Sequence, residues 1–184
     1  MVNSSIDLPS NTQTPLQVHV NRNGFKESLH EVDIAACDAD GLVILGMGDV
    51  ESIIFPRSAM KPLQSIALIE LLNSSSDIPE FSEAEVALIC ASHNGETLHT
   101  EAVTELLGKF DISIDELTCG AHWSMDQKTM ISQVRSMDEP HKVHNNCSGK
   151  HAGMLILSKL INGNTSSYAK LANVSQQQIL GTLE

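Results

Sequence analysis

The sequence predicts an α/β protein of the α+β type, in which an antiparallel sheet is followed by packed helices. Two observations carry this prediction. Short strand-like segments separated by glycine-containing turns occupy residues 16–55, and after residue 56 the spacing of apolar residues changes to the period of a helix. The 184 residues are 41% apolar, enough to build a core without disulfides or metal. Residues 1–15 are polar and lack apolar periodicity, and we expect them to form a disordered tail.

Three strands are expected in the first segment. Residues 17–20 and 31–37 lie on either side of an Asn23-Gly24 turn, and residues 42–47 follow the turn at 38–41. Asn-Gly and Asp-rich turns with glycine are typical of hairpin connections. Together these segments predict an antiparallel meander.

The helical part has four strong segments. Apolar periodicity predicts helices over residues 63–71, 97–109 and 148–160, and Ser82 with Glu85 forms a capping box that opens another. Residues 113–117 are expected to form one short turn, and the polar stretch 118–146 is too long for a simple connector, which favours a functional or partly structured loop.

A last helix begins at Ser175 and meets no stop signal before residue 184, so we expect the chain to be cut from a longer one.

The charge and the cysteines limit the function classes. Eleven basic and 23 acidic residues give a net charge of −12, which argues against nucleic acid and anionic membranes as partners. No leader-like segment or membrane-spanning apolar run is found, so we expect a cytoplasmic protein. Four widely spaced cysteines are interpreted as buried thiols, one of them a possible metal ligand, with Cys37 and Cys90 in the core. A small polar substrate or a protein partner remains.

Ser58 and Lys61 form a Ser-x-x-Lys motif at the start of a predicted helix. Residues three apart face the same side of a helix, so the Lys61 amine can approach the Ser58 hydroxyl and act as its base. Arg57 supplies a neighbouring cation. The alternative is a capping serine beside a solvated lysine, and Pro62 disfavours helical angles at Lys61.

Two further clusters contain reactive groups. Ser92 and His93, near His99, can assist proton transfer, although Asn94 and Gly95 can equally be a simple helix end. In the second cluster Cys147, Lys150 and His151 lie on the first turn of the helix 148–160. The helix dipole and the lysine favour the thiolate form of that cysteine.

The segments PRSAMKPLQ, ASHNGE with His99, and HNNCSGKHAGM, with CGAH between the last two, resemble the bacterial L-asparaginase II family of the rhizobial type. The resemblance runs from about Val20 to the last residue, and the family is similar in fold to serine β-lactamases and glutaminases. It implies that Ser58 and Lys61 form one Ser-Lys pair, and that Ser92 belongs to a second pair whose lysine comes later in the chain. Arg57 and His151 would line the substrate pocket.

The resemblance also implies zinc. Cys147 and Lys150 match two ligands of a zinc site whose third protein ligand is a later cysteine, so the site would be incomplete in this chain. Family members run to nearly twice this length, and residues 16–184 would be the N-terminal portion of the catalytic domain. His122-Trp123 replaces the His-x-Pro expected after the CGxH segment. We also expect a homo-oligomer.

The function implied is hydrolysis of L-asparagine to L-aspartate and ammonia through a Ser-Lys activated serine. One alternative is a truncated chain or pseudo-enzyme that retains only a metal or small-molecule site. The other is a penicillin-recognising serine hydrolase, which is disfavoured because Lys128-Thr129 is followed by Met130 rather than glycine, and because no Ser-Asp-Asn occurs.

Overall fold

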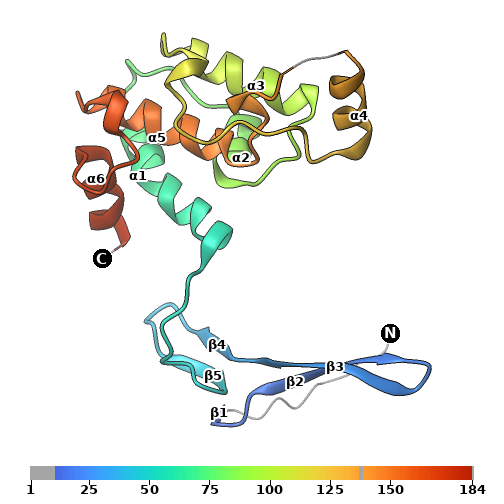
Figure 1. The fold of residues 1–184 in the computed structure, drawn as a ribbon. Helices are drawn as coiled ribbons and strands as arrows, with labels where there is room; N and C mark the ends of the chain where they lie inside the picture. The colour runs from blue at the N-terminus through green and yellow to red at the C-terminus, as the bar shows by residue number, and fades with distance from the viewer. Residues whose placement is uncertain (1–10, 137–138, 184) are drawn as a thin grey trace, which may run out of the picture. The chain divides into compact units, whose positions relative to one another are not determined.

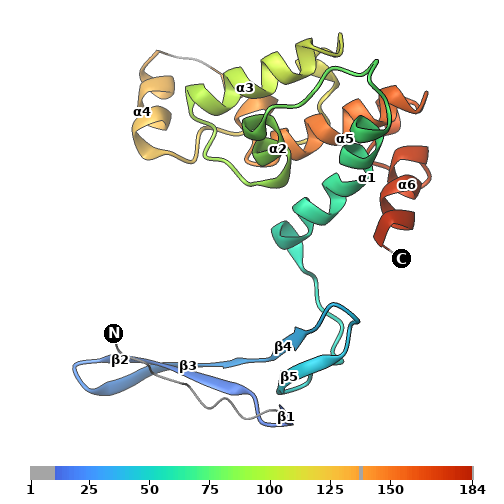
Figure 2. The same cartoon turned by 180° about the vertical axis from the view of Figure 1, so that it is seen from behind.

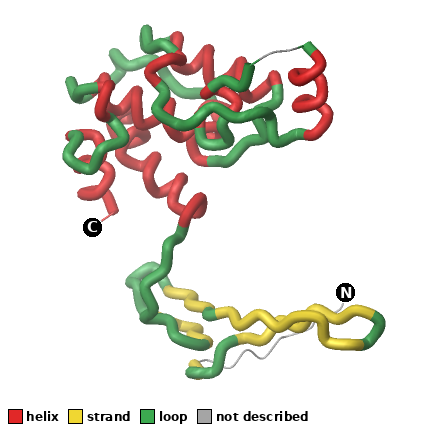
Figure 3. Tube along the Cα trace, viewed as in Figure 1, coloured by secondary structure: helices red, strands yellow, loops and turns green. Residues whose placement is uncertain are grey.

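A computed structural model describes residues 11–136 and 139–183 of the chain. It divides into two compact units, Met1–Phe55 and Pro56–Glu184. The named strands lie in the first unit and the helices in the second (Figures 1 and 3). The boundary falls where the sequence changes its apolar period, and the mixed content agrees with the predicted α+β type.

The first unit begins with a two-stranded hairpin. β2 (Leu16–Arg22) pairs antiparallel with β3 (Phe25–Val32). The turn between them is the predicted one, and Asn23 and Gly24 both take the left-handed backbone, with φ of 49° and 80°. Only glycine and asparagine adopt this conformation readily, which is why the pair predicts the hairpin.

A second, three-stranded sheet has the order β1-β5-β4. β4 (Ile34–Cys37) and β5 (Val43–Met47) are antiparallel, and β1 (Asn11–Thr12) is parallel to β5. The predicted single meander is therefore wrong, because the strand expected at 31–37 is divided at Asp33. The Asp33 carboxylate accepts the Asp49 N–H at 3.1 Å and fixes this break. β1 lies within the predicted tail 1–15, of which residues 1–10 are outside the described part.

The second unit contains six α-helices among its described residues (Figure 2). Four short 3₁₀ helices connect or precede them: η1 (Arg57–Met60), η2 (Ile114–Glu116), η3 (Lys142–His144) and η4 (Thr165–Ser167). The α-helices are α1 (Lys61–Ser74), α2 (Glu83–Cys90), α3 (Thr97–Gly108), α4 (Gln127–Arg135), α5 (Ser148–Leu160) and α6 (Val174–Leu183).

Helix α5 is the centre of this unit and contacts α1, α2, α3 and α6. Its residues 152–158 are all buried. Gly149, in its first turn, is needed for the approach of α2, because a β-carbon there would overlap the backbone carbonyl of Leu88. Two helix backbones thus meet at the end of α5 that carries the HNNCSGKH segment.

A capping signal in the sequence correctly predicted where α2 begins. The Ser82–Glu85 capping box is confirmed, since each side chain bonds the backbone N–H of the other residue. The stretch 118–146 is partly structured, as expected, but it contains α4, which the apolar pattern did not reveal.

All four cysteines are free, and Cys37 is exposed, so its assignment to the core was wrong. In the described part of the chain no helix is long and apolar enough to cross a membrane.

Candidate active site

Lys61, Ser92 and Ser58 form one chain of hydrogen bonds. The Lys61 side chain is buried, with 2% of the residue exposed, and its Nζ donates to Ser92 Oγ at 2.7 Å and to the Ala91 carbonyl at 3.0 Å. The Ser92 hydroxyl in turn lies 3.3 Å from Ser58 Oγ. The Lys61 amine is thus connected to the Ser58 hydroxyl through the hydroxyl of Ser92. The family resemblance had instead implied that Ser92 pairs with a different, later lysine.

The start of α1 explains how Lys61 is placed. η1 runs directly into α1, and the Lys61 N–H bonds the Ser58 carbonyl. Pro62 does not prevent helical angles at Lys61, whose φ and ψ are −59° and −44°. In the first turn a proline removes no intrahelical bond, so the expected obstacle is small. Arg57, which opens η1, is exposed and has a left-handed backbone with φ of 51°.

The residue after Ser92 is His93, which is buried, with 6% of the residue exposed. His93 Nε2 lies 2.8 Å from Ser148 Oγ, and His93 Nδ1 accepts the Gly95 N–H at 3.0 Å. The His93 backbone N–H donates to the Asn146 carbonyl at 3.2 Å. The segment after α2 and the start of α5 are therefore bonded together beside the two serines.

These segments lie within the part of the chain that a family comparison matches. The family model for L-asparaginase II matches residues 18–184. The chain belongs to the L-asparaginase II family. Membership indicates hydrolysis of an amide, with L-asparagine as the general substrate of the family. No curated protein matched the sequence.

His151 lies one turn into α5 of this L-asparaginase II family chain and is held by Tyr168. Its Nδ1 is 2.6 Å from the Tyr168 hydroxyl, which also accepts the Thr118 N–H at 2.9 Å. The hydroxyl therefore bonds both the Thr118 backbone and the His151 ring, and it fixes the position of that ring. Burial, with Lys150 and Lys61 nearby, lowers the pKa of His151 to about 4.

The predicted zinc ligands are the N-cap and the third residue of α5. Cys147 and Lys150 are half-buried and three residues apart, so they share one side of the first turn. Within residues 11–136 and 139–183, no three His, Cys, Asp or Glu side chains gather closely enough to hold a metal ion. The donors present do not complete a tetrahedral zinc site, and zinc stays a prediction.

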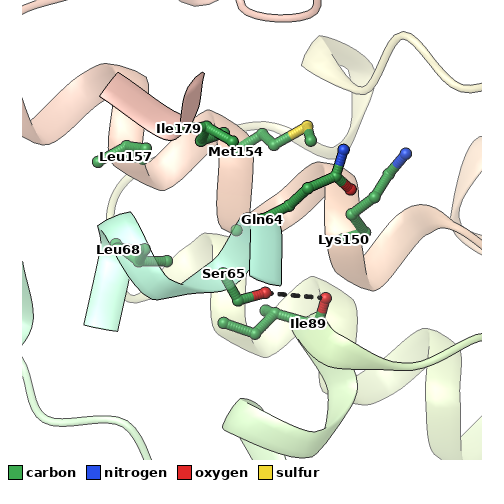
Figure 4. A pocket seen from close by; sticks show the side chains of 9 residues that line it. Gln64, Ser65, Leu68, Ile89, Lys150, Met154, Leu157 and Ile179 are labelled. Carbon is green, nitrogen blue, oxygen red and sulfur yellow. Dashed lines mark hydrogen bonds between the residues drawn. The ribbon is translucent and has the colours of Figure 1, made fainter. Parts of the chain in front are cut away.

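A small cavity of about 10 Å³ lies beside this region (Figure 4). Its walls come from α1, α2, α5 and α6 and are mostly apolar, with Lys150 and Gln64 among them. The Ser65 hydroxyl, which lines the cavity, donates to the Lys61 carbonyl at 2.9 Å. This volume suits about one water molecule, so the cavity is too small for an amino-acid substrate.

The sequence did not single out Ser148 or Tyr168 as functional residues. Both are fully buried, and both hold a histidine of the candidate site. Ser148 looks like a helix cap in the sequence, and Tyr168 lies in a polar stretch without periodicity. Their partners are 55 and 17 residues away, and no local pattern records such contacts.

We expect the free energy of unfolding to fall as the pH decreases from about 6.5 to about 4. Burial is the main reason that the pKa of His93 is lowered from 6.5 to about 4. Between these values the unfolded chain binds a proton at His93 that the folded chain does not. Stability therefore decreases by up to about 1.4 kcal/mol per pH unit from this residue. The charged or titratable neighbours that add to the effect are His99, Lys61, His122 and His144.

Urea unfolding at several pH values checks this expectation, with His93→Gln as the comparison. The variant lacks the titrating ring, so its stability should depend less steeply on pH in this range. Identical slopes for the two proteins would contradict the assignment to His93.

Proposed function

We propose that the chain hydrolyses the side-chain amide of L-asparagine, with Ser58 as nucleophile and Lys61 as base. The observation that carries this proposal is the buried Lys61 amine, 2.7 Å from a serine that in turn contacts Ser58. Family membership supports the substrate class. A serine needs such a base, because its hydroxyl is a weak nucleophile until the proton is removed.

The reaction follows from the order of these groups. With its amine neutral, Lys61 accepts the Ser92 proton while Ser92 accepts that of Ser58, and Ser58 Oγ attacks the amide carbon. The tetrahedral intermediate collapses when its C–N bond breaks, and the proton held by Lys61 passes to the leaving nitrogen, which departs as ammonia. Water then hydrolyses the Ser58 ester, releasing L-aspartate and restoring the Ser58 hydroxyl.

Arg57 and His151 are the residues proposed to bind the substrate. The exposed guanidinium of Arg57 is next to Ser58 in the sequence, and it can pair with the α-carboxylate of asparagine. The charge of Lys61 acts on His151, and the His151 ring is proposed to hydrogen-bond the substrate. We further propose a serine β-lactamase or glutaminase type of catalytic domain, a cytoplasmic location and a homo-oligomer.

The test is ammonia release from L-asparagine, measured beside L-glutamine and a chromogenic β-lactam. Ammonia from asparagine that disappears in Ser58→Ala supports the proposal. Hydrolysis of the β-lactam alone would favour a penicillin-recognising hydrolase. Saturable binding of asparagine without ammonia release would favour a pseudo-enzyme.

For zinc, we expect weak binding that depends on Cys147. A thiol and a lysine ligate metal only after losing a proton, so zinc content should fall as the pH is lowered from about 9 to about 6. Elemental analysis of the wild type and of Cys147→Ser over this range measures the effect. Equal zinc content in both proteins would leave Cys147 as an ordinary thiol.

A further inference from the structure

We propose that His93 is a positioning residue: through Ser148 it ties the segment carrying Ser92 to the start of α5, and so holds the Ser92 hydroxyl at the Lys61 amine. The effect of this His93–Ser148 hydrogen bond on catalysis rests on the proposed function. The positioning of Ser92 by the bond does not depend on that function. Among the described residues no hydrogen bond joins His93 to Ser58 or to Lys61, so His93 acts through its neighbour in the chain, Ser92.

The two ends of the hydrogen-bond chain fix its direction. The Gly95 N–H can only donate, so His93 Nδ1 is an acceptor. At the other end the Val143 carbonyl can only accept, and the Ser148 hydroxyl donates to it at 2.9 Å. Ser148 Oγ must then accept from His93 Nε2 at 2.8 Å, and the ring is neutral with its proton on Nε2. Every polar atom of this buried chain has a partner.

The backbone around His93 is also bonded, on one side to the segment before α5 and on the other to the loop before α4. Its N–H donates to the Asn146 carbonyl, and the Asn94 carbonyl accepts the Met125 N–H at 2.7 Å. Gly95 has φ of 72°, and a β-carbon there would overlap the His144 carbonyl. The backbone of residues 93–95 therefore has little conformational freedom. The His93 ring joins this segment to α5 by its hydrogen bond to Ser148.

Ser92 lies between this fixed segment and Lys61. On one side the Lys61 amine bonds Ser92 Oγ and the Ala91 carbonyl, and on the other His93 is bonded to Ser148. Ser92 is exposed, and a surface serine ordinarily exchanges among rotamers and positions. The proposed role of the His93–Ser148 bond is to restrain the backbone that carries this hydroxyl.

Charged and titratable groups surround the ring from several elements. His99 of α3 stacks on it, with centroids 5.1 Å apart and planes within 9°. Lys61, His122 and His144 complete the set. All of these groups are basic, so they favour the neutral ring that the hydrogen-bond directions require.

The experiment compares Ser148→Ala with Ser158→Ala. Both serines are fully buried in α5, but Ser158 bonds Asn173 and the turn at Gly163. Within the described part of the chain, no hydrogen bond joins Ser158 to residues 92–95. Acetylation of Lys61 by an amine reagent, followed by mass spectrometry, reports whether the amine is still bonded to Ser92 and so less reactive. We expect about tenfold faster acetylation in Ser148→Ala and less than about twofold change in Ser158→Ala.

Two His93 variants distinguish the hydrogen bond to Ser148 from the simple packing of the side chain. In His93→Gln the side-chain amide can still donate to Ser148, whereas in His93→Asn it reaches only the place of Nδ1. Glutamine should keep the slow acetylation and asparagine should lose it. Nitrogen NMR of the wild type should show the proton on His93 Nε2, and a proton on Nδ1 would overturn the proposal.

The kinetic readout distinguishes this proposal from the proposed function. Ser148→Ala should lower kcat for asparagine about tenfold with KM little changed, because the tie acts on Ser92 and not on the substrate. If the wild type releases no ammonia but Lys61 acetylation responds as expected, the proposed function fails and the positioning role stands. Equal acetylation rates in wild type, Ser148→Ala and His93→Asn would overturn the positioning role.

Discussion

Ser58→Ala should lower ammonia release from asparagine by at least about 10³-fold, with the melting temperature nearly unchanged. The hydroxyl is exposed, so its removal leaves no buried cavity, but it removes the proposed nucleophile. Initial rates at saturating asparagine, with circular dichroism to show that the variant is folded, measure both parts of the expectation.

Lys61→Met and Ser92→Ala are the matched comparisons. Without the amine the serine keeps its proton, so Lys61→Met should resemble Ser58→Ala. Ser92→Ala interrupts the path between Lys61 and Ser58 and should also lose most of the activity. More than about a tenth of wild-type turnover in Ser58→Ala would move the nucleophile to Ser92, which is the serine that Lys61 contacts directly.

Gly149→Ala is expected to have the largest effect on stability, a loss of about 3 kcal/mol in the free energy of unfolding. A β-carbon at this position overlaps the Leu88 carbonyl, which belongs to the backbone of α2 and cannot turn away. The two helices must therefore separate, and the buried packing between them is lost. Denaturant unfolding gives the free energy, and a melting temperature lower by about 10 °C should accompany it.

Gly108→Ala provides the control for this substitution. Gly108 ends α3, and a β-carbon there would meet no atom within 4 Å. Alanine is the better helix former, so this variant should be as stable as the wild type or slightly more stable. Similar losses in the two variants would show that glycine itself, and not the approach of α2, is what matters at position 149.

The sequence predicted the elements whose signals are local. The helix at 148–160 was expected with the bounds that the structure gives, because its apolar face repeats regularly and Asn162 with Gly163 closes it. The hairpin turn at Asn23-Gly24 was found for a similar reason. Helix α4 was missed because it is short and contains few apolar residues, of which Ile131 and Val134 are exposed, so its apolar pattern is weak within a long polar stretch.

The sequence predicted which residues form the candidate site, but not which of their side chains bond one another. Ser58, Lys61 and Ser92 were all named from motifs, and the three side chains do lie together. That Lys61 bonds Ser92 was not expected, because Ser-x-x-Lys spacing suggests a direct contact with Ser58. The pairing instead depends on where α2 ends relative to α1, which tertiary packing decides.

The backbone at Arg57 creates a conflict between heat resistance and substrate recognition. A left-handed conformation costs a residue with a side chain about 1–2 kcal/mol, and glycine is free of that cost. The substitution that relaxes the chain at this position would therefore delete the guanidinium proposed to bind the asparagine carboxylate. Selection of variants by thermal survival alone should favour glycine at position 57, whereas selection for growth on asparagine should retain the strained arginine.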